Sequence, residues 1–285
     1  MSLSLKDYNK HVREFSLEEP CDFLIYRPIA FFIVKSTYSL PLNPNHFSVG
    51  ALIFSIFAGI QLQKGTPQSF MWAGICIFLF STFDCCDGIV ARAKKNGSKY
   101  GTFIDMFVDL ISNICFYLGL FLGLKKNLGD SLIPYLTWLS AFFILLHASL
   151  YHFYKKQYLC YLDKNPDGRK IEIENYRKDY EKLNQKPGHF FEKMLLKLFL
   201  IYSKFQKKSE NIIRYKMDLY PLKNKPLLPF WGAIAGSTHL TVLAFSLIFG
   251  NIFCYFYFAI FFSNIWMAIA YLIQKNTNTS IIEGY

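Results

Sequence analysis

Four aspartates stand beside two apolar runs in the stretch of chain from residue 81 to residue 110. Asp84 and Asp87 are three positions apart in the first run, and Asp105 and Asp109 are four positions apart in the second. Side chains at these spacings share one face of an α-helix. If both runs are helical, each of them presents a pair of carboxylates along a single face.

The residues between the two pairs are polar, which predicts a turn joining two antiparallel helices. At a rise of about 1.5 Å per residue, Asp87 and Asp105 lie roughly one to two turns from this connection, and Asp84 and Asp109 roughly two to three turns from it. These matched depths let the four carboxylates converge. Carboxylates in a low-dielectric pocket must be protonated or neutralised by cations.

The donor atoms of such a cluster are all oxygens, which suits a hard divalent ion such as Mg²⁺ or Mn²⁺ and leaves room for two ions. Because magnesium is often held by a few carboxylates together with substrate phosphates, we expect a phosphate-bearing substrate. Gly88, Ala91 and Gly101 leave space for the close approach of a ligand or backbone. Arg92 offers a forked cation that suits phosphate.

The alternative is that these acids are helix-end groups that reach water, with Arg92 paired to Asp84 or Asp87. Four acids at matched depth on two facing helices argue against this, because ionisable groups within membrane helices are rare and usually functional. The residues therefore predict a metal and phosphate site.

The composition places this site in a membrane protein. Of the 285 residues, 53% are hydrophobic and 19% are aromatic, and the mean hydropathy is +0.21. These values are too apolar for an ordinary soluble domain of this length. The first twenty residues are polar and charged, which argues against a cleavable signal peptide and favours a cytoplasmic amino terminus. The seven cysteines show no CxxC pair, so a disulfide scaffold is not expected.

Six apolar segments approach the length of about 20 residues that a helix needs to cross a bilayer. They cover residues 47–63, 68–90, 101–124, 131–153, 228–249 and 251–273. Short polar turns join them, except for one long connection between the fourth and the fifth. The expected fold class is an all-α integral membrane protein, a bundle of six transmembrane helices.

An apolar segment at residues 21–40 precedes the first span and is interrupted by Arg27, Pro28 and Lys35. We expect an amphipathic helix that lies in the membrane interface with its cations toward the lipid headgroups. The alternative is a seventh span, which two cations and a proline make costly.

The charge of the connections predicts the orientation. Residues 154–227 contain 18 Lys and Arg against 9 Asp and Glu, and such segments favour the cytoplasmic side. Within them, residues 189–208 space apolar side chains at helical intervals among lysines, which predicts a surface helix attracted to anionic lipid. We expect four parts. Residues 1–43 form a cytoplasmic amino terminus with the interfacial helix, and residues 44–153 form four spans with the aspartates. Residues 154–227 form a basic cytoplasmic segment, and residues 228–285 form two spans and a tail.

Eight residues of this region resemble, in type and spacing, the signature of the CDP-alcohol phosphotransferase family, also called CDP-alcohol phosphatidyltransferases. They are Asp84, Asp87, Gly88, Ala91, Arg92, Gly101, Asp105 and Asp109. The resemblance is close over residues 44–124, and the basic segment is larger than in compact members of the family.

The resemblance implies a transferase in which an alcohol attacks the β-phosphorus of a CDP-linked substrate, forms a phosphodiester and releases CMP. It implies that all four aspartates bind metal and that Asp109 also acts as general base on the hydroxyl. It implies nucleotide contacts by six residues, among which Ser48 replaces the threonine of the family. These six are Asn45, Ser48, Gly88, Ala91, Arg92 and Gly101.

The "DMFVD" sequence at residues 105–109 is more similar to that of inositol-using members, which favours CDP-diacylglycerol as donor and a polyol or similar headgroup as acceptor. The transfer of choline or ethanolamine phosphate to diacylglycerol or a related lipid stays open. The partners expected besides substrates are membrane lipid and a second copy of the chain, without nucleic acid, at a cell (inner) membrane with the site facing the cytoplasm. A cation-coupled transporter is the alternative of another class, and it predicts broken helices and polar residues at mid-membrane in the later spans.

Overall fold

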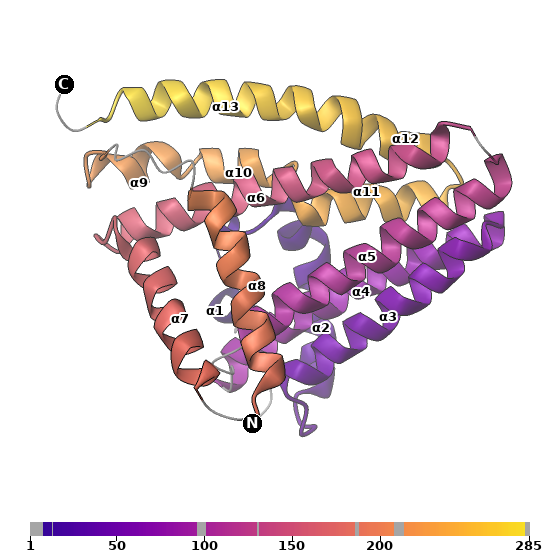
Figure 1. Ribbon diagram of the computed structural model, residues 1–285, viewed down its shortest axis with the longest axis horizontal. Helices are drawn as coiled ribbons and strands as arrows, with labels where there is room; N and C mark the ends of the chain where they lie inside the picture. Colours follow the sequence, from indigo (N-terminus) through magenta and orange to yellow (C-terminus); the bar gives the residue numbers. More distant parts are fainter. Residues whose placement is uncertain are drawn as a thin grey trace.

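The computed structural model describes residues 8–12, 14–95, 101–129, 131–185, 188–207 and 214–282. Within these residues the chain is largely helical, and extended pairing is confined to an isolated antiparallel bridge between Tyr215 and Ile282. Six described helical segments are long and apolar enough to cross a membrane: Pro44–Lys64, Pro67–Lys94, Ile104–Leu128, Ile133–Leu162, Leu227–Ile248 and Ile252–Thr279. The predicted all-α, six-span fold is confirmed (Figure 1).

The first three spans are α3 (Pro44–Lys64), α4 (Pro67–Lys94) and α5 (Gly101–Leu128), and α3 packs against both of the others. The contact between α3 and α5 is a backbone contact. A Cβ atom on Gly119 would lie 2.5 Å from the carbonyl oxygen of Gly59. Only glycine permits so close an approach of two helices, so these residues fix α5, which carries two of the aspartates, against α3.

Local sequence signals set where these helices begin. Pro44 occupies the first helical position of α3, and the backbone N–H of Asn43 donates to Nδ1 of His46 at 2.9 Å. Proline suits this position because the first N–H groups of a helix have no partner within the helix. At the start of α4, Oγ1 of Thr66 accepts from the N–H of Ser69 at 3.2 Å. A side-chain cap of this kind is typical of a helix start.

The later spans are less regular. The fourth combines η4 (Ile133–Tyr135) with α6 (Leu136–Leu162), so its helix continues beyond the expected end at residue 153. The fifth is divided into α10 (Leu227–Gly232) and α11 (Gly236–Ile248). The sixth comprises α12 (Ile252–Tyr257), the π-helical turn η5 (Phe258–Phe262) and α13 (Ser263–Thr279).

The segment before the first span is helical. It contains α1 (Tyr8–His11), η2 (Phe15–Leu17), η3 (Asp22–Tyr26) and α2 (Arg27–Thr37). η3 runs into α2 without a break, and this continuous helical segment is not among the six candidate spans of the described chain. Helix α2 lies along α4 and packs Ala30, Phe31 and Val34 into a cluster with residues of that helix.

The expectation that Arg27 faces the lipid headgroups is wrong. Arg27 is only 8% exposed. Its guanidinium forms an ion pair with Glu18, with Nη2 and Oε2 3.2 Å apart. The protein itself supplies the counter-charge, so the side chain is stable away from water.

The long basic connection folds into α7 (Gly168–Asn184), α8 (Phe190–Lys207) and α9 (Leu219–Asn224). Figure 1 shows α7 and α8 as a pair beside the spans. Leu196 of α8 is fully buried against Ile104 and Phe107 of α5 and Tyr176 of α7. The helix expected at residues 189–208 is present, and part of its apolar face packs on protein, next to Asp105.

Candidate active site

The four aspartates are placed by one helical hairpin. Asp84 and Asp87 lie in the C-terminal half of α4, and Asp105 and Asp109 lie in the first turns of α5. The residues that join the two helices, 96–100, lie outside the described part of the chain. The carboxylate of Asp87 is within electrostatic range of the other three, and Asp109 is within range of Asp84 and Asp105. The fold therefore brings the four carboxylates into one region.

The four carboxylates differ in exposure. Asp87 is 8% exposed, Asp84 and Asp105 are half-buried, and Asp109 is exposed. Oγ of Ser48, from α3, donates to Oδ2 of Asp87 at 2.9 Å. This hydrogen bond orients the deepest carboxylate from a helix that carries none of the aspartates.

The residues present fit a divalent metal in donor chemistry. No described group of three or more His, Cys, Asp or Glu side chains is arranged closely enough to hold an ion. Nevertheless, in the described part of the chain none of the four aspartates forms an ion pair with Lys or Arg. Like charges in range of one another repel, and a hard cation with oxygen ligands would offset that repulsion. Mg²⁺ and Mn²⁺ both match this donor set.

Two guanidinium groups pack closely against Gly88 of α4. A Cβ atom on Gly88 would lie 3.3 Å from Nη1 of Arg27 and 3.3 Å from Nη1 of Arg92. Arg92 belongs to the same helix, whereas Arg27 comes from α2. Ala91 is half-buried beside them. Arg27 is thus a neighbour of the site that the sequence does not mark, because a lone arginine in an apolar segment gives no sign of where it folds.

The remaining nucleotide candidates are less enclosed. Asn45 lies exposed in the first turn of α3, and Ser48 follows one turn later on the buried side. Gly101 is the first residue of α5, and its surroundings lie outside the described residues.

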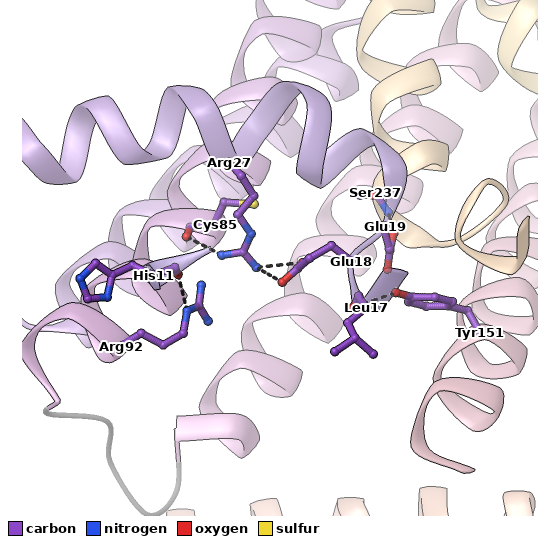
Figure 2. A network of polar contacts seen from close by, with 9 residues as sticks. All are labelled: His11, Leu17, Glu18, Glu19, Arg27, Cys85, Arg92, Tyr151 and Ser237. Carbon is purple, nitrogen blue, oxygen red and sulfur yellow. Dashed lines mark hydrogen bonds and ion pairs between the residues drawn. The ribbon is translucent and has the colours of Figure 1, made fainter. Parts of the chain in front are cut away.

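The chain before α2 and the first residue of α2 contact Cys85 and Arg92 of α4, as Figure 2 shows. Nε of Arg92 donates to the carbonyl oxygen of His11. Nη2 of Arg27 donates to Oε1 and Oε2 of Glu18 at 3.3 and 3.2 Å, and its Nη1 donates to the carbonyl oxygen of Cys85 at 3.1 Å. We call residues 14–27 the N-terminal strap.

The same strap reaches the later spans (Figure 2). Oε2 of Glu19 accepts from the backbone N–H of Ser237 at 2.6 Å, and the hydroxyl of Tyr151 donates to the carbonyl oxygen of Leu17 at 3.3 Å. The strap therefore connects α4, which carries two aspartates, to α6 and α11.

The strap also brings two carboxyl groups near the site. Burial raises the pKa of Glu19, and the pKa of Asp22 is raised by burial and then by the nearby charge of Glu19. Both groups are within electrostatic range of Asp109. A raised pKa favours the neutral form of a carboxyl group, so these two groups contribute less negative charge near Asp109 than exposed carboxylates would.

The break in the fifth span does not build an acidic site. It falls at Ala233–Ala235, and Glu19 caps the start of α11 that follows it, where a negative charge is favourable. A broken helix is a feature that the transporter alternative predicts, yet the four aspartates lie on α4 and α5 instead. His239, just after the break, has its Nε2 3.0 Å from Nδ1 of His147, and both histidines are fully buried.

Comparison with known proteins finds similarity in the region that contains the four aspartates. Residues 42–162 match the family model described as CDP-alcohol phosphatidyltransferase. An archaetidylinositol phosphate synthase of Pyrococcus horikoshii is 30% identical over 91 residues, which are 32% of this chain and 47% of that protein. Phosphatidylinositol phosphate synthases of Mycobacteroides abscessus and Corynebacterium glutamicum are 35% identical over 96 residues and 29% identical over 90 residues. These matches cover 34% and 32% of this chain and 41% and 38% of those relatives. The chain thus spans less than half the length of each of these relatives.

Proposed function

We propose that this chain, whose residues 42–162 match the CDP-alcohol phosphatidyltransferase family model, is an integral membrane transferase that joins an alcohol to the β-phosphorus of a CDP-linked substrate and releases CMP. The observation that carries the proposal is the gathering of four carboxylates on the α4–α5 hairpin inside the matched region.

The four aspartates would hold Mg²⁺ or Mn²⁺, and four carboxylates are enough for two ions. When bound, the metal would neutralise charge on the pyrophosphate oxygens. Asp87 would serve as the fixed ligand, because it is the most buried of the four and is held by Ser48. Asp109 would accept the proton of the alcohol, because it is exposed where a substrate can reach it.

The nucleotide would lie along α4 and the start of α3. Gly88 and Ala91 would leave room for it, and Arg92 would offer paired donors to its phosphates. Ser48, Asn45 and Gly101 would complete the contacts. Ser48 would then link the nucleotide to Asp87, since its hydroxyl already donates to that carboxylate.

For the substrates, we propose CDP-diacylglycerol as donor and a polyol or similar headgroup as acceptor. The names of the relatives support an inositol-containing acceptor. The alternative is a CDP-linked headgroup such as CDP-choline with diacylglycerol or a related lipid as acceptor. We further propose a homodimer in the cell (inner) membrane with the site at the cytoplasmic face, where a lipid and a soluble substrate meet.

The test is CMP release by the purified protein in lipid nanodiscs. CDP-diacylglycerol, CDP-choline and CDP-ethanolamine are each supplied with Mg²⁺ or Mn²⁺ and with inositol, inositol phosphate, serine, glycerol phosphate or diacylglycerol. We expect CMP from CDP-diacylglycerol only when a divalent ion and an acceptor are both present. Asp109→Asn should abolish release, while Asp163→Asn, at the end of α6, should not. The proposal fails if no combination yields CMP or if Asp87→Asn keeps full turnover.

A further inference from the structure

Arg27 is a buried cation that the proposed reaction does not yet use. It is the first residue of α2 and lies outside the region that matches the family. Its Nη1 and Nη2 atoms donate to Cys85 and Glu18, but its buried Nε has no hydrogen-bond partner in the described part of the chain. A buried donor without a partner is costly, so this N–H is available to a ligand.

Two guanidinium groups converge on Gly88. A Cβ atom there would lie 3.3 Å from Nη1 of Arg27 and 3.3 Å from Nη1 of Arg92, so only the absence of a side chain lets both groups approach the backbone so closely. The two side chains come from different helices and reach the same side of α4. Arginine offers planar, forked donors that match phosphate oxygens, so two neighbouring guanidinium groups suit an anion with several oxygens.

This pair of guanidinium groups lies next to the aspartates. Asp84 precedes Gly88 by one helical turn, and its carboxylate is within electrostatic range of Arg27. In the described residues Arg27 forms its ion pair with Glu18 and not with Asp84. The strap thus holds Arg27 beside the four aspartates. Its ion pair is with Glu18, so Arg27 does not pair with a carboxylate that would bind metal.

We propose that Arg27 is a further donor-binding residue, whose guanidinium acts with that of Arg92 to hold the diphosphate of the CDP-linked substrate over Gly88. Glu18 is a positioning residue, which holds Arg27 without contacting the substrate. This inference rests on the proposed function, because the diphosphate is the group that such a substrate would bring to the aspartates.

The competing explanation is that Arg27 only fastens the strap to α4. The two explanations differ in a double variant. Removing one partner of a buried ion pair destabilises a protein because the other charge is left buried and unpaired, whereas removing both is far less costly. Glu18→Gln with Arg27→Gln should therefore restore the melting temperature that Arg27→Gln alone lowers. If Arg27 binds the donor, the double variant regains stability but not donor affinity.

The experiment uses the full chain in nanodiscs and measures the melting temperature, the Kd for CDP and the KM values for CDP-diacylglycerol and for the acceptor. Losing a hydrogen bond to a charged group corresponds to a roughly tenfold to hundredfold weaker interaction. We therefore expect the donor KM and the Kd for CDP to rise roughly tenfold to hundredfold in Arg27→Gln and in the double variant. The acceptor KM should stay unchanged. Arg27→Lys, which keeps the charge but loses the fork, should show a smaller rise.

Lys35→Gln is the matched control, because it removes a cation from the same helix at a distance from Gly88, and it should leave all these values unchanged. The inference is overturned if the folded double variant binds CDP and CDP-diacylglycerol as the wild type does. A wild-type protein that releases no CMP and binds no CDP overturns the proposed function and this inference together. If the wild type turns over and the double variant has the same donor KM and Kd for CDP as the wild type, only this inference is overturned.

Discussion

The hydrogen bond between Ser48 and Asp87 offers a direct test of how the deepest carboxylate is held. Ser48 is 4% exposed, and its Oγ lies 2.9 Å from Oδ2 of Asp87. Ser48→Ala removes only the hydroxyl, so the packing of α3 on α4 is kept. A hydrogen bond to a charged group contributes about 1.5–3 kcal/mol, and losing a group that orients a metal ligand weakens metal binding roughly tenfold to hundredfold.

We therefore expect Ser48→Ala to require roughly tenfold or more Mg²⁺ or Mn²⁺ for half-maximal CMP release. Calorimetric titration of Mn²⁺ in the absence of substrate should show the same loss. Ser48→Thr retains the hydroxyl and should behave as the wild type. Ser55→Ala is the matched control on the same helix, because the Ser55 hydroxyl donates to the Leu52 carbonyl of its own helix, at 2.8 Å. An unchanged metal requirement in Ser48→Ala would refute the orienting role of Ser48.

Three further predictions concern stability. Gly119→Val should lower the free energy of unfolding by about 1–3 kcal/mol or prevent folding, because any side chain there meets the Gly59 carbonyl. Gly236→Ala should not, because no atom lies within 4 Å of the added Cβ. Melting curves in detergent compare the two variants. Leu196→Ala should cost about 2–5 kcal/mol and expose the α7–α8 pair to protease, whereas Leu222→Ala at an exposed position should leave digestion unchanged. Burial raises the pKa of Glu19 above its usual 4.5, so the folded state binds this proton more tightly than the unfolded state does, and the contribution of Glu19 falls as the pH rises from 4.5 through the raised value. Glu19→Gln keeps an oxygen for the Ser237 N–H and should flatten this part of the stability profile, and an identical profile in the variant would contradict it.

Much of the hairpin follows from the sequence alone. The apolar runs are long enough to identify six spans, and the spacing of Asp84, Asp87, Asp105 and Asp109 places two acids on one face of each helix. Both arguments depend on local properties, the length of an apolar run and the helical repeat. The structure retains both features, with the two acid pairs on α4 and α5.

The parts that the sequence does not reveal depend on tertiary contacts. Arg27 is interpreted as a headgroup contact because arginine is costly in an apolar segment, but Glu18 neutralises it from a segment without periodicity. The mean hydropathy of residues 227–248 indicates one span, and yet the helix stops at Gly232 and restarts at Gly236, where Glu19 supplies the cap. The end of α6 is missed for a different reason: hydropathy marks where an apolar run stops, while the helix continues to Leu162.

These contacts bear on where substrate choice resides. All the predicted metal and nucleotide residues fall within residues 42–162, the region that matches the family model. Side chains from outside this region also contact it: Arg27 donates to the Cys85 carbonyl, and Leu196 of α8 packs against Ile104 and Phe107. Glu19 lies within electrostatic range of Asp109 and accepts from the Ser237 N–H at the start of α11, so the strap lies near both the aspartates and the later spans. Under the proposed function, substitutions on the strap and on α8 are therefore the first to test for an effect on acceptor specificity.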